Sequence, residues 1–144
     1  MLPLWRKLMS YHVQFDQSFE IKENAEQIFK EFLLKTIKNT NNCVYIALVK
    51  ENTIAYMMGL KDFRPPVFKD SECAYISDAF VMEKYRNKGV GGKLCRKLIS
   101  WFYNEGITRL EVQAAINNNI SVPFWRSIGF RPYLTSMYLK NRKK

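Results

Sequence analysis

Apolar residues recur at helical spacing in two segments near the start of the chain. The first segment covers residues 4–15, and the second follows Asn24, a favoured N-cap residue with Gln27 three positions later. The second segment carries a single apolar stripe formed by Ala25, Ile28, Phe29, Phe32, Leu33 and Ile37. The pattern therefore predicts two amphipathic helices before any strand.

Runs of β-branched and aromatic residues then predict strands. Residues 43–49 and 53–60 are joined by three polar residues and predict a hairpin, whereas Pro65 and Pro66 predict a loop after it. Residues 74–82 predict a third strand. The remaining expected elements are a helix with Leu94, Leu98, Trp101 and Phe102 on one face, a strand at 110–114, a helix at 121–128 and a last strand at 133–139.

This order of elements indicates an α/β (α+β) fold. No repeat, linker or change of composition divides the chain, so we expect one domain over residues 1–144. A hydrophobic content of 47% and an aromatic content of 15% exclude a disordered chain. The longest apolar run, residues 43–49, is far too short to span a bilayer, so we expect no membrane partner.

The first residues and the cysteines favour a cytoplasmic protein. The N-terminus has its charges after its apolar residues and lacks the long apolar region of a secretory signal. Cys43, Cys73 and Cys95 are widely spaced within apolar patterns, which favours reduced structural thiols. The single histidine, His12, gives no support for a zinc site.

The charge is strongly positive and unevenly distributed. Lys and Arg number 23 against 13 Asp and Glu, a formal net charge of +10. Six basic residues and no acid lie between positions 84 and 97, and no carboxylate side chain follows Glu111. These clusters are consistent with a solvated surface, with nucleic-acid binding or with a site for a phosphate-bearing small molecule.

A glycine-containing turn favours the small anion. The strand predicted at 74–82 runs into glycines at positions 89, 91 and 92 and then into a basic helix. The first N–H groups of a helix bind phosphate when no side chain blocks the approach, and glycine removes that block. Arg86, Lys88 and Lys93 add positive charge around the turn. The turn matches neither the dinucleotide-binding nor the P-loop pattern.

The residues around this turn resemble a known family. The segment AFVMEKYRNKGVGGKL, residues 79–94, resembles the acetyl-CoA signature of the GNAT superfamily of acyl-CoA N-acyltransferases, Arg/Gln-x-x-Gly-x-Gly/Ala after a strand. Residues 118–130 are similar to the family's downstream motif, Asn-x-x-Ala-x-x-Phe-Tyr-x-x-x-Gly-Phe. The resemblance implies a GNAT-like mixed, mostly antiparallel sheet flanked by helices, and an N-acetyltransferase that uses acetyl-CoA.

The resemblance also implies which residues bind the cosubstrate. The backbone of Phe80 and Val81 would pair with the pantetheine arm, and the amides of the turn would hold the pyrophosphate. Asn118 would either contact the cofactor or cap the following helix, for which asparagine is also suited. The implied cofactor-binding residues are Phe80, Val81, Arg86, Asn87, Lys88, Gly89, Val90, Gly91, Gly92 and Asn118.

Acetyl transfer to an amine needs a base for the amine and a hydrogen-bond donor for the carbonyl oxygen. The backbone N–H near Phe80 or Val81 would be that donor. The candidate bases are Asp78, Glu111 and Glu72, acting directly or through water. Each of these carboxylates is also compatible with a purely structural role.

The departing thiolate needs a proton. The tyrosine that is frequent in the family's downstream motif is Trp125 here, and an indole N–H cannot protonate a thiolate as a phenol can. Tyr133 and Tyr138 are the candidate donors, with Tyr138 taken as the catalytic residue; the alternative is that solvent protonates the thiolate.

The acceptor and the partners are less defined by the sequence. The amine could belong to a small metabolite, an amino acid, a polyamine, an antibiotic or a protein. The residues expected on the acceptor side are Tyr11, His12, Asp16, Phe63, Arg64 and Phe68. The alternative function is a nonenzymatic acyl-CoA sensor or a basic nucleic-acid-binding module, although no known nucleic-acid motif occurs.

The chain begins inside the first expected helix, where family members usually have a preceding strand. Either the coding start was placed late or the sheet lacks an edge strand. An uncovered strand edge favours pairing with another chain, so either a homodimer or poor solubility is expected.

If Trp125 is packing rather than chemistry, Trp125→Phe will keep most of the transferase activity. The measurement is kcat for the variant beside a thermal unfolding curve. A large loss of kcat in a variant that still folds would show that the indole takes part in the reaction.

Overall fold

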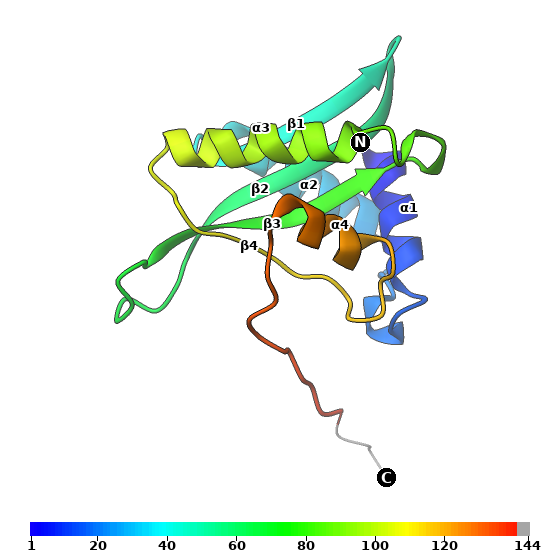
Figure 1. The fold of residues 1–144 in the computed structure, drawn as a ribbon. Helices are drawn as coiled ribbons and strands as arrows, with labels where there is room; N and C mark the ends of the chain where they lie inside the picture. Colours follow the sequence, from blue (N-terminus) through cyan, green and yellow to red (C-terminus); the bar gives the residue numbers. More distant parts are fainter. Residues whose placement is uncertain (141–144) are drawn as a thin grey trace.

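A four-stranded sheet forms the middle layer of the structure, a computed structural model that describes residues 1–140 (Figure 1). Its strands lie in the order β1 (Asn42–Val49), β2 (Asn52–Phe63), β3 (Glu72–Val81) and β4 (Leu110–Val112). The first three pair antiparallel, and β4 pairs parallel to β3. The mixed, mostly antiparallel sheet predicted from the sequence is confirmed.

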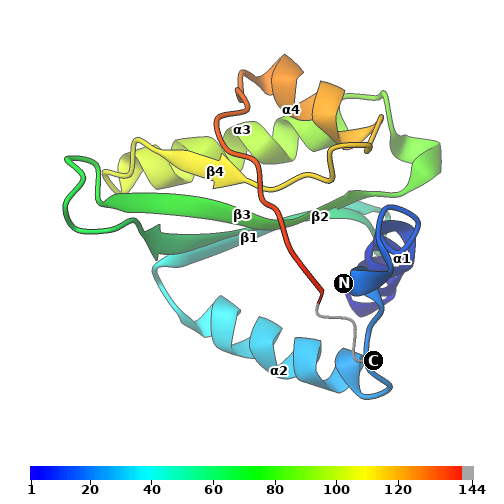
Figure 2. The same cartoon turned by 90° about the horizontal axis from the view of Figure 1, so that it is seen from below.

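Helices cover both faces of this sheet (Figure 2). Helices α1 (Leu2–His12) and α2 (Ala25–Lys38) lie on one face, and α3 (Val90–Asn104) and α4 (Ser121–Ile128) lie on the other. Two short 3₁₀ turns, η1 (Gln17–Phe19) and η2 (Glu83–Tyr85), follow α1 and β3. Asn24 does precede α2, but its side chain makes no capping hydrogen bond, so that part of the prediction is wrong.

Each face of the sheet has its own core. The core under α3 and α4 includes Ala55, Met57, Ile76, Leu94, Leu98, Phe102 and Trp125. The core under α1 and α2 includes Leu4, Trp5, Leu8, Phe29, Leu33, Tyr56, Met58 and Phe80. Neighbouring residues of β2 thus face opposite cores, as the strand period of two requires. Because β2 and β3 are covered on both faces, they form the rigid base on which the turn after β3 is held.

The strand predicted at 133–139 is absent, and this prediction is wrong. Side chains hold the segment instead: the Tyr133 hydroxyl donates to Glu111 Oε2 at 2.6 Å, and the Tyr138 hydroxyl donates to Asp16 Oδ2 at 2.5 Å. Pro132 has no N–H to give to a ladder, and β4, which would receive a new strand, has only three residues. The segment crosses the edge of the sheet without joining it (Figure 2).

At the other side of the sheet, β1 is an edge strand. No strand precedes α1 in the structure, and Ile46 and Leu48 of β1 are exposed. Pairing of this edge with a second chain stays a prediction. Cys43, Cys73 and Cys95 are buried and free. Among residues 1–140, no helix is long and apolar enough to cross a membrane, and no three metal-ligating side chains gather.

Gly59 of β2 lies where side chains of α3 pack closely against the sheet. A Cβ atom there would be 2.5 Å from Cε2 of Phe102 and 3.1 Å from Cδ1 of Leu98, both of which are buried. Gly59→Ala should therefore lower the free energy of unfolding by about 1–3 kcal/mol in urea titrations. Gly92→Ala is the matched control, because its added methyl group would meet only the flexible end of Arg96. Equal stability of Gly59→Ala and wild type would contradict this packing.

Candidate active site

A gap opens between β3 and β4 beyond their short pairing. Only three residue pairs join the two strands: Ala74–Leu110, Tyr75–Glu111 and Ile76–Val112. β3 continues on to Val81, whereas β4 ends at Val112. The edge of β3 that faces β4 therefore has no strand partner after Ile76, and backbone N–H groups on it can bind an extended ligand.

A β-bulge decides which backbone groups face this gap. Met58 pairs with Asp78 and Gly59 pairs with Ile76, so Ser77 is an extra residue in β3. Before the bulge, the amide of Ala74 donates to Arg109 on the β4 side; after it, the amide of Met82 donates to Ile54 of β2. In a regular strand, the backbone N–H groups of residues an even number apart point toward the same neighbouring strand. Ala74 and Met82 are eight residues apart but point toward opposite neighbours, so the bulge has reversed the alternation.

This reversal assigns the open edge to Ala79 and Val81. Because Met82 faces β2, the backbone of Phe80 also faces β2, and the N–H groups of Ala79 and Val81 point into the gap. The sequence-based expectation named Phe80 and Val81. Val81 is on the open edge, but the neighbour that shares it is Ala79, because the bulge shifts the alternation.

The turn after β3 leaves the start of α3 uncapped. Asn87 and Gly89 adopt positive φ angles of 58° and 77°, and Gly89 precedes α3 without any side-chain cap. The amides of the first helical turn, at residues 90–92, therefore lack intrahelical partners. A Cβ atom on Gly91 would be 3.3 Å from the Phe124 ring of α4 and 3.4 Å from Val81 Cγ2. The glycines thus allow α3, α4 and β3 to meet at one place.

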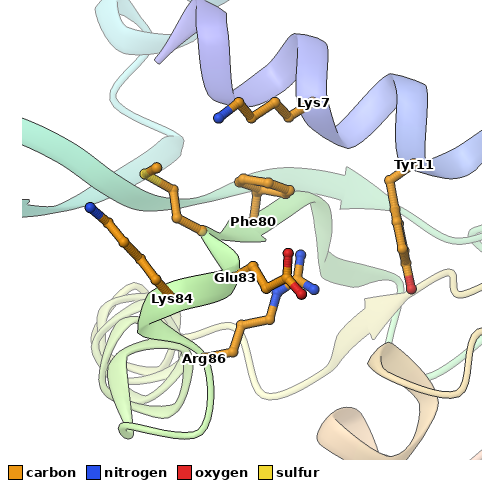
Figure 3. Close-up of a pocket in the computed structure, with 7 residues that line it drawn as sticks. Lys7, Tyr11, Phe80, Glu83, Lys84 and Arg86 are labelled. Carbon is orange, nitrogen blue, oxygen red and sulfur yellow. The ribbon is translucent and has the colours of Figure 1, made fainter.

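Arg86 points away from this turn. Its Nε donates to the carbonyl oxygen of Val81 at 3.0 Å, and its guanidinium lies 5.8 Å from the Phe80 ring centroid and 5.9 Å from that of Tyr11. A cavity of about 470 Å³ lies here between α1 and η2 (Figure 3). Its lining residues are Lys7, Tyr11, Phe80, Met82, Glu83, Lys84 and Arg86.

Asn118 lies at the far side of the gap and is buried. Its Oδ1 accepts hydrogen bonds from the amides of Ile120 at 3.1 Å and Ser121 at 2.9 Å, which caps the start of α4. The Tyr11 hydroxyl approaches the same oxygen at 3.4 Å, so α1 and α4 come together across the open end of the gap. The capping interpretation of Asn118 is confirmed, and its contact with a cofactor stays a prediction.

Asp78 lies directly after the bulge and on the same face of β3 as Phe80. Burial raises the pKa of its carboxyl group, and the neighbouring hydroxyls of Ser77 and Tyr56 oppose this rise in part. No ion pair to Asp78 occurs in the described part of the chain. A carboxyl group held in this way can accept a proton nearer to neutral pH than an exposed one.

The other two candidate carboxylates, Glu111 and Glu72, are paired with cations. Glu111 Oε1 lies 2.7 Å from Arg109 Nε and 3.7 Å from Arg64 Nε. Burial tends to raise the pKa of Glu111, but hydrogen bonds from Tyr133 and Arg109 outweigh it and hold the pKa below its usual value. Glu72 forms an ion pair with Lys61 at 3.1 Å.

Tyr138 is exposed and lies against the loop after α1. Hydrogen bonds from Tyr138 and Ser18 lower the pKa of Asp16 to about 2. The same hydrogen bond to Asp16 raises the pKa of Tyr138. Trp125 is buried and packs edge-to-face against Phe124 and Phe130, with ring centroids 4.8 and 5.5 Å away. The structure therefore brings Val81 and the glycine turn together on the side of α3 and α4. Asp78 lies on the opposite face of the same strand, and Tyr138 belongs to a separate contact.

The model of the Acetyltransferase (GNAT) family matches residues 5–130. This chain belongs to that family. It is an acetyl-CoA-dependent acetyltransferase, with acetyl-CoA as its cosubstrate. No curated protein matches the sequence.

Several solved structures share the GNAT fold. A mutant of the BH1408 protein from Bacillus halodurans is 20% identical and has a TM-score of 0.82, with 98% of this chain and 91% of that chain covered. The aminoglycoside 6'-N-acetyltransferase AAC(6')-IG from Acinetobacter haemolyticus is 19% identical, with a TM-score of 0.71 and coverage of 85% and 86%. AAC(6')-Iy, in complex with the bisubstrate analog CoA-S-monomethyl-acetylneamine, is 18% identical, with a TM-score of 0.70 and coverage of 99% and 92%.

The geometry fits the chemistry of acetyl-CoA. A pyrophosphate is a multiply charged anion, and uncapped amides at the start of a helix bind such anions. The start of α3 has no side-chain cap, and residues 89, 91 and 92 are glycines, which have no side chain to obstruct the ligand. An amide-bearing arm can pair with an open strand edge, which the segment from Ser77 to Val81 offers.

Sequence reasoning missed Tyr56 and Ser77. Tyr56 belongs to an apolar strand pattern, and nothing in that pattern indicates that it is a diagonal neighbour of Asp78 in the sheet. Ser77 did leave a signal: two consecutive polar residues, Ser77 and Asp78, interrupt an otherwise apolar strand, which is a position where a bulge is expected.

Gly91→Val should weaken acetyl-CoA binding. The branched side chain would push against Phe124 and Val81 and so displace the first turn of α3 from its place beside β3 and α4. In calorimetric titrations we expect at least a tenfold weaker Kd for CoA, about 1.4 kcal/mol. Ile99→Val, on the same helix but further along it, is the control. Unchanged CoA affinity in a folded Gly91→Val protein would remove the turn from the binding site.

Proposed function

We propose that this GNAT member transfers acetyl from acetyl-CoA to a primary amine by direct attack in a ternary complex, within one domain formed by residues 1–144. The observation that carries the proposal is the position of Asp78. A carboxyl group without a cationic partner follows the bulge directly, beside the backbone edge that β3 leaves open. The three buried, unbridged cysteines support a place in the reducing cytoplasm.

Binding of acetyl-CoA would use backbone groups above all. In this proposal the amides of the turn at 87–92 hold the pyrophosphate, and the open edge at Ala79 and Val81 pairs with the pantetheine arm. One of these two N–H groups also donates a hydrogen bond to the thioester carbonyl oxygen as negative charge develops there. Arg86 closes the α1 side of the site through its contacts with Val81, Phe80 and Tyr11.

Asp78 acts as the base. The acceptor enters as an ammonium ion, and a neutral amine is needed for attack, so a proton passes from its nitrogen to the Asp78 carboxylate. Since burial raises the pKa of Asp78, the group is protonated and inactive below that pKa, and activity should fall as the pH falls through it. Glu111 and Glu72 are less suited, because cations already pair with them.

Solvent supplies the proton for the departing thiolate in this proposal. Trp125 is packed in the core, the Tyr133 hydroxyl donates to Glu111, and the Tyr138 hydroxyl donates to Asp16. Positioning of the amine against the thioester then contributes most of the acceleration.

The structural neighbours suggest which class of acceptor to test first. An aminoglycoside acetyltransferase from an uncultured soil metagenomic sample, in complex with sisomicin, is 21% identical with a TM-score of 0.68, and 98% of this chain and 90% of that chain are covered. We propose amino sugars as the first acceptors to test. The net charge of +10 opposes a polycation at long range, but Asp16 and Asp78 carry no ion pair in the described residues and can attract an ammonium group locally.

The test measures release of free CoA thiol across a panel of sisomicin, spermidine, amino acids and a lysine peptide. With the best acceptor, Asp78→Asn should lower kcat by about 10²-fold or more, because a general base contributes that much. Glu111→Gln and Glu72→Gln should keep kcat within a few-fold. Thermal shifts should be equal with CoA in all three variants.

Thiol release that is unaffected by Asp78→Asn, or a loss of the same size in Glu111→Gln, would overturn the assignment of the base. Stabilisation by acetyl-CoA without thiol release for any amine would favour an acyl-CoA sensor. Stabilisation by duplex DNA alone would favour a nucleic-acid-binding module.

A further inference from the structure

The register and the bulge place three oxygen-bearing residues next to one another on β2 and β3. They are Asp78, with its carboxyl group, and Ser77 and Tyr56, with their hydroxyls. Tyr56 is fully buried, and both hydroxyl oxygens are closed to solvent without a hydrogen bond of standard geometry in the described part of the chain. Buried hydroxyls without partners are costly, so their presence next to a carboxyl group calls for a physical reason.

The register of the sheet explains how Tyr56 reaches Asp78. Tyr56 pairs with Phe80, and Met58 pairs with Asp78, so Tyr56 and Asp78 are diagonal neighbours on adjacent strands. Aromatic side chains bridge such diagonals. Tyr56 and Phe80 lie in the core under α1 and α2, and Asp78 follows the same alternation after the bulge. The bulge itself puts Ser77 beside the carboxyl group.

Few charged groups act on this carboxyl. Tyr56 faces it from β2, and Ser77 and Tyr75 lie near it on β3, where Asp78 adds to the rise in the pKa of Tyr75. No ionisable side chain of α1, α2, α3 or β4 acts on Asp78 among the described residues. The two neutral hydroxyls are therefore the groups able to favour its charged form.

We propose that Tyr56 and Ser77 are positioning residues that hold the Asp78 carboxylate in its ionised form and fix its orientation beside the gap. This inference rests on the proposed function, in which Asp78 is the base. Since both hydroxyl oxygens are closed to solvent, neither touches the acceptor, and both act through Asp78. During transfer the amine proton goes to the Asp78 carboxylate, and the protons of Tyr56 and Ser77 stay on their own oxygens.

The sign of the effect follows from which form the hydroxyls favour. An O–H group rotated toward a carboxylate stabilises the anion and so opposes the rise in pKa that burial causes. Removing the Tyr56 hydroxyl leaves burial unopposed at that side, and the pKa of Asp78 rises further. The carboxylate then becomes protonated at a higher pH, and the low-pH part of the activity profile is lost first.

The experiment compares kcat/KM across pH for wild type, Tyr56→Phe and Ser77→Ala with the best amine of the panel. We expect the acid limb to move up by about one pH unit in Tyr56→Phe, a tenfold loss at low pH and less than threefold on the alkaline plateau. Tyr45→Phe is the matched control: it also removes a strand tyrosine hydroxyl, but Tyr45 packs against the core under α3 and α4. An unshifted profile in both test variants, or an equal loss at every pH, would overturn the proposal.

A second readout needs no activity. The carboxyl carbon of Asp78 is titrated by NMR in wild type, Tyr56→Phe and Ser77→Ala, so that a poorly folding Tyr56→Phe protein still leaves Ser77→Ala as a test. A higher pKa in either folded variant supports the coupling, and identical titrations overturn it. If Asp78→Asn keeps full activity, the base assignment fails on its own, and the NMR titration separates that failure from a failure of the coupling.

Discussion

The pairing of β3 with β4 stops after three residues, and the site depends on that stop. A longer ladder would consume the backbone groups that β3 presents to the gap, and no extended ligand could enter the sheet. The bulge at Ser77 acts together with this short pairing. It turns the backbone N–H groups of Ala79 and Val81 toward the gap, while those of Phe80 and Met82 remain bonded to β2. The sheet therefore has an unpaired strand edge between β3 and β4, although all four strands remain in it.

The same bulge separates the two sides of the reaction. Ala79 and Val81 place their side chains in the core under α3 and α4, where the glycine turn begins. Phe80 belongs to the core under α1 and α2, and Asp78 shares that face. A cosubstrate arriving from the turn and an acceptor arriving beneath α1 would meet at the edge of β3. One inserted residue thus sets both which backbone groups face the gap and the face of β3 on which Asp78 lies.

The positive charge has a more local meaning than its total suggests. A net charge of +10 is compatible with a polyanionic partner, but the uncapped amides and the glycines at the turn are suited to a small phosphate-bearing molecule. Arg86 contacts Val81, Phe80 and Tyr11 and so links β3 to α1. Its contact with the phosphates stays a prediction.

The sequence was sufficient for the features that depend on local pattern. The hairpin, the glycine turn and the helix after it follow from periodicity and from motifs. The strand at 133–139 was predicted from its β-forming residues, yet the segment is held by Tyr133 and Tyr138 because the three-residue β4 offers too short an edge. The roles of Tyr56 and Ala79 could not be predicted, because they follow from a register between strands that no local pattern encodes.

The most direct measurement of the central claim is amide hydrogen exchange, resolved by residue with NMR, with and without acetyl-CoA. If the open edge of β3 holds the pantetheine arm, the amides of Ala79 and Val81 will become protected by at least about tenfold on binding, while those of Phe80 and Met82, already bonded to β2, will change little. Acetyl-CoA that binds tightly but leaves Ala79 and Val81 exchanging as in the free protein would contradict the account.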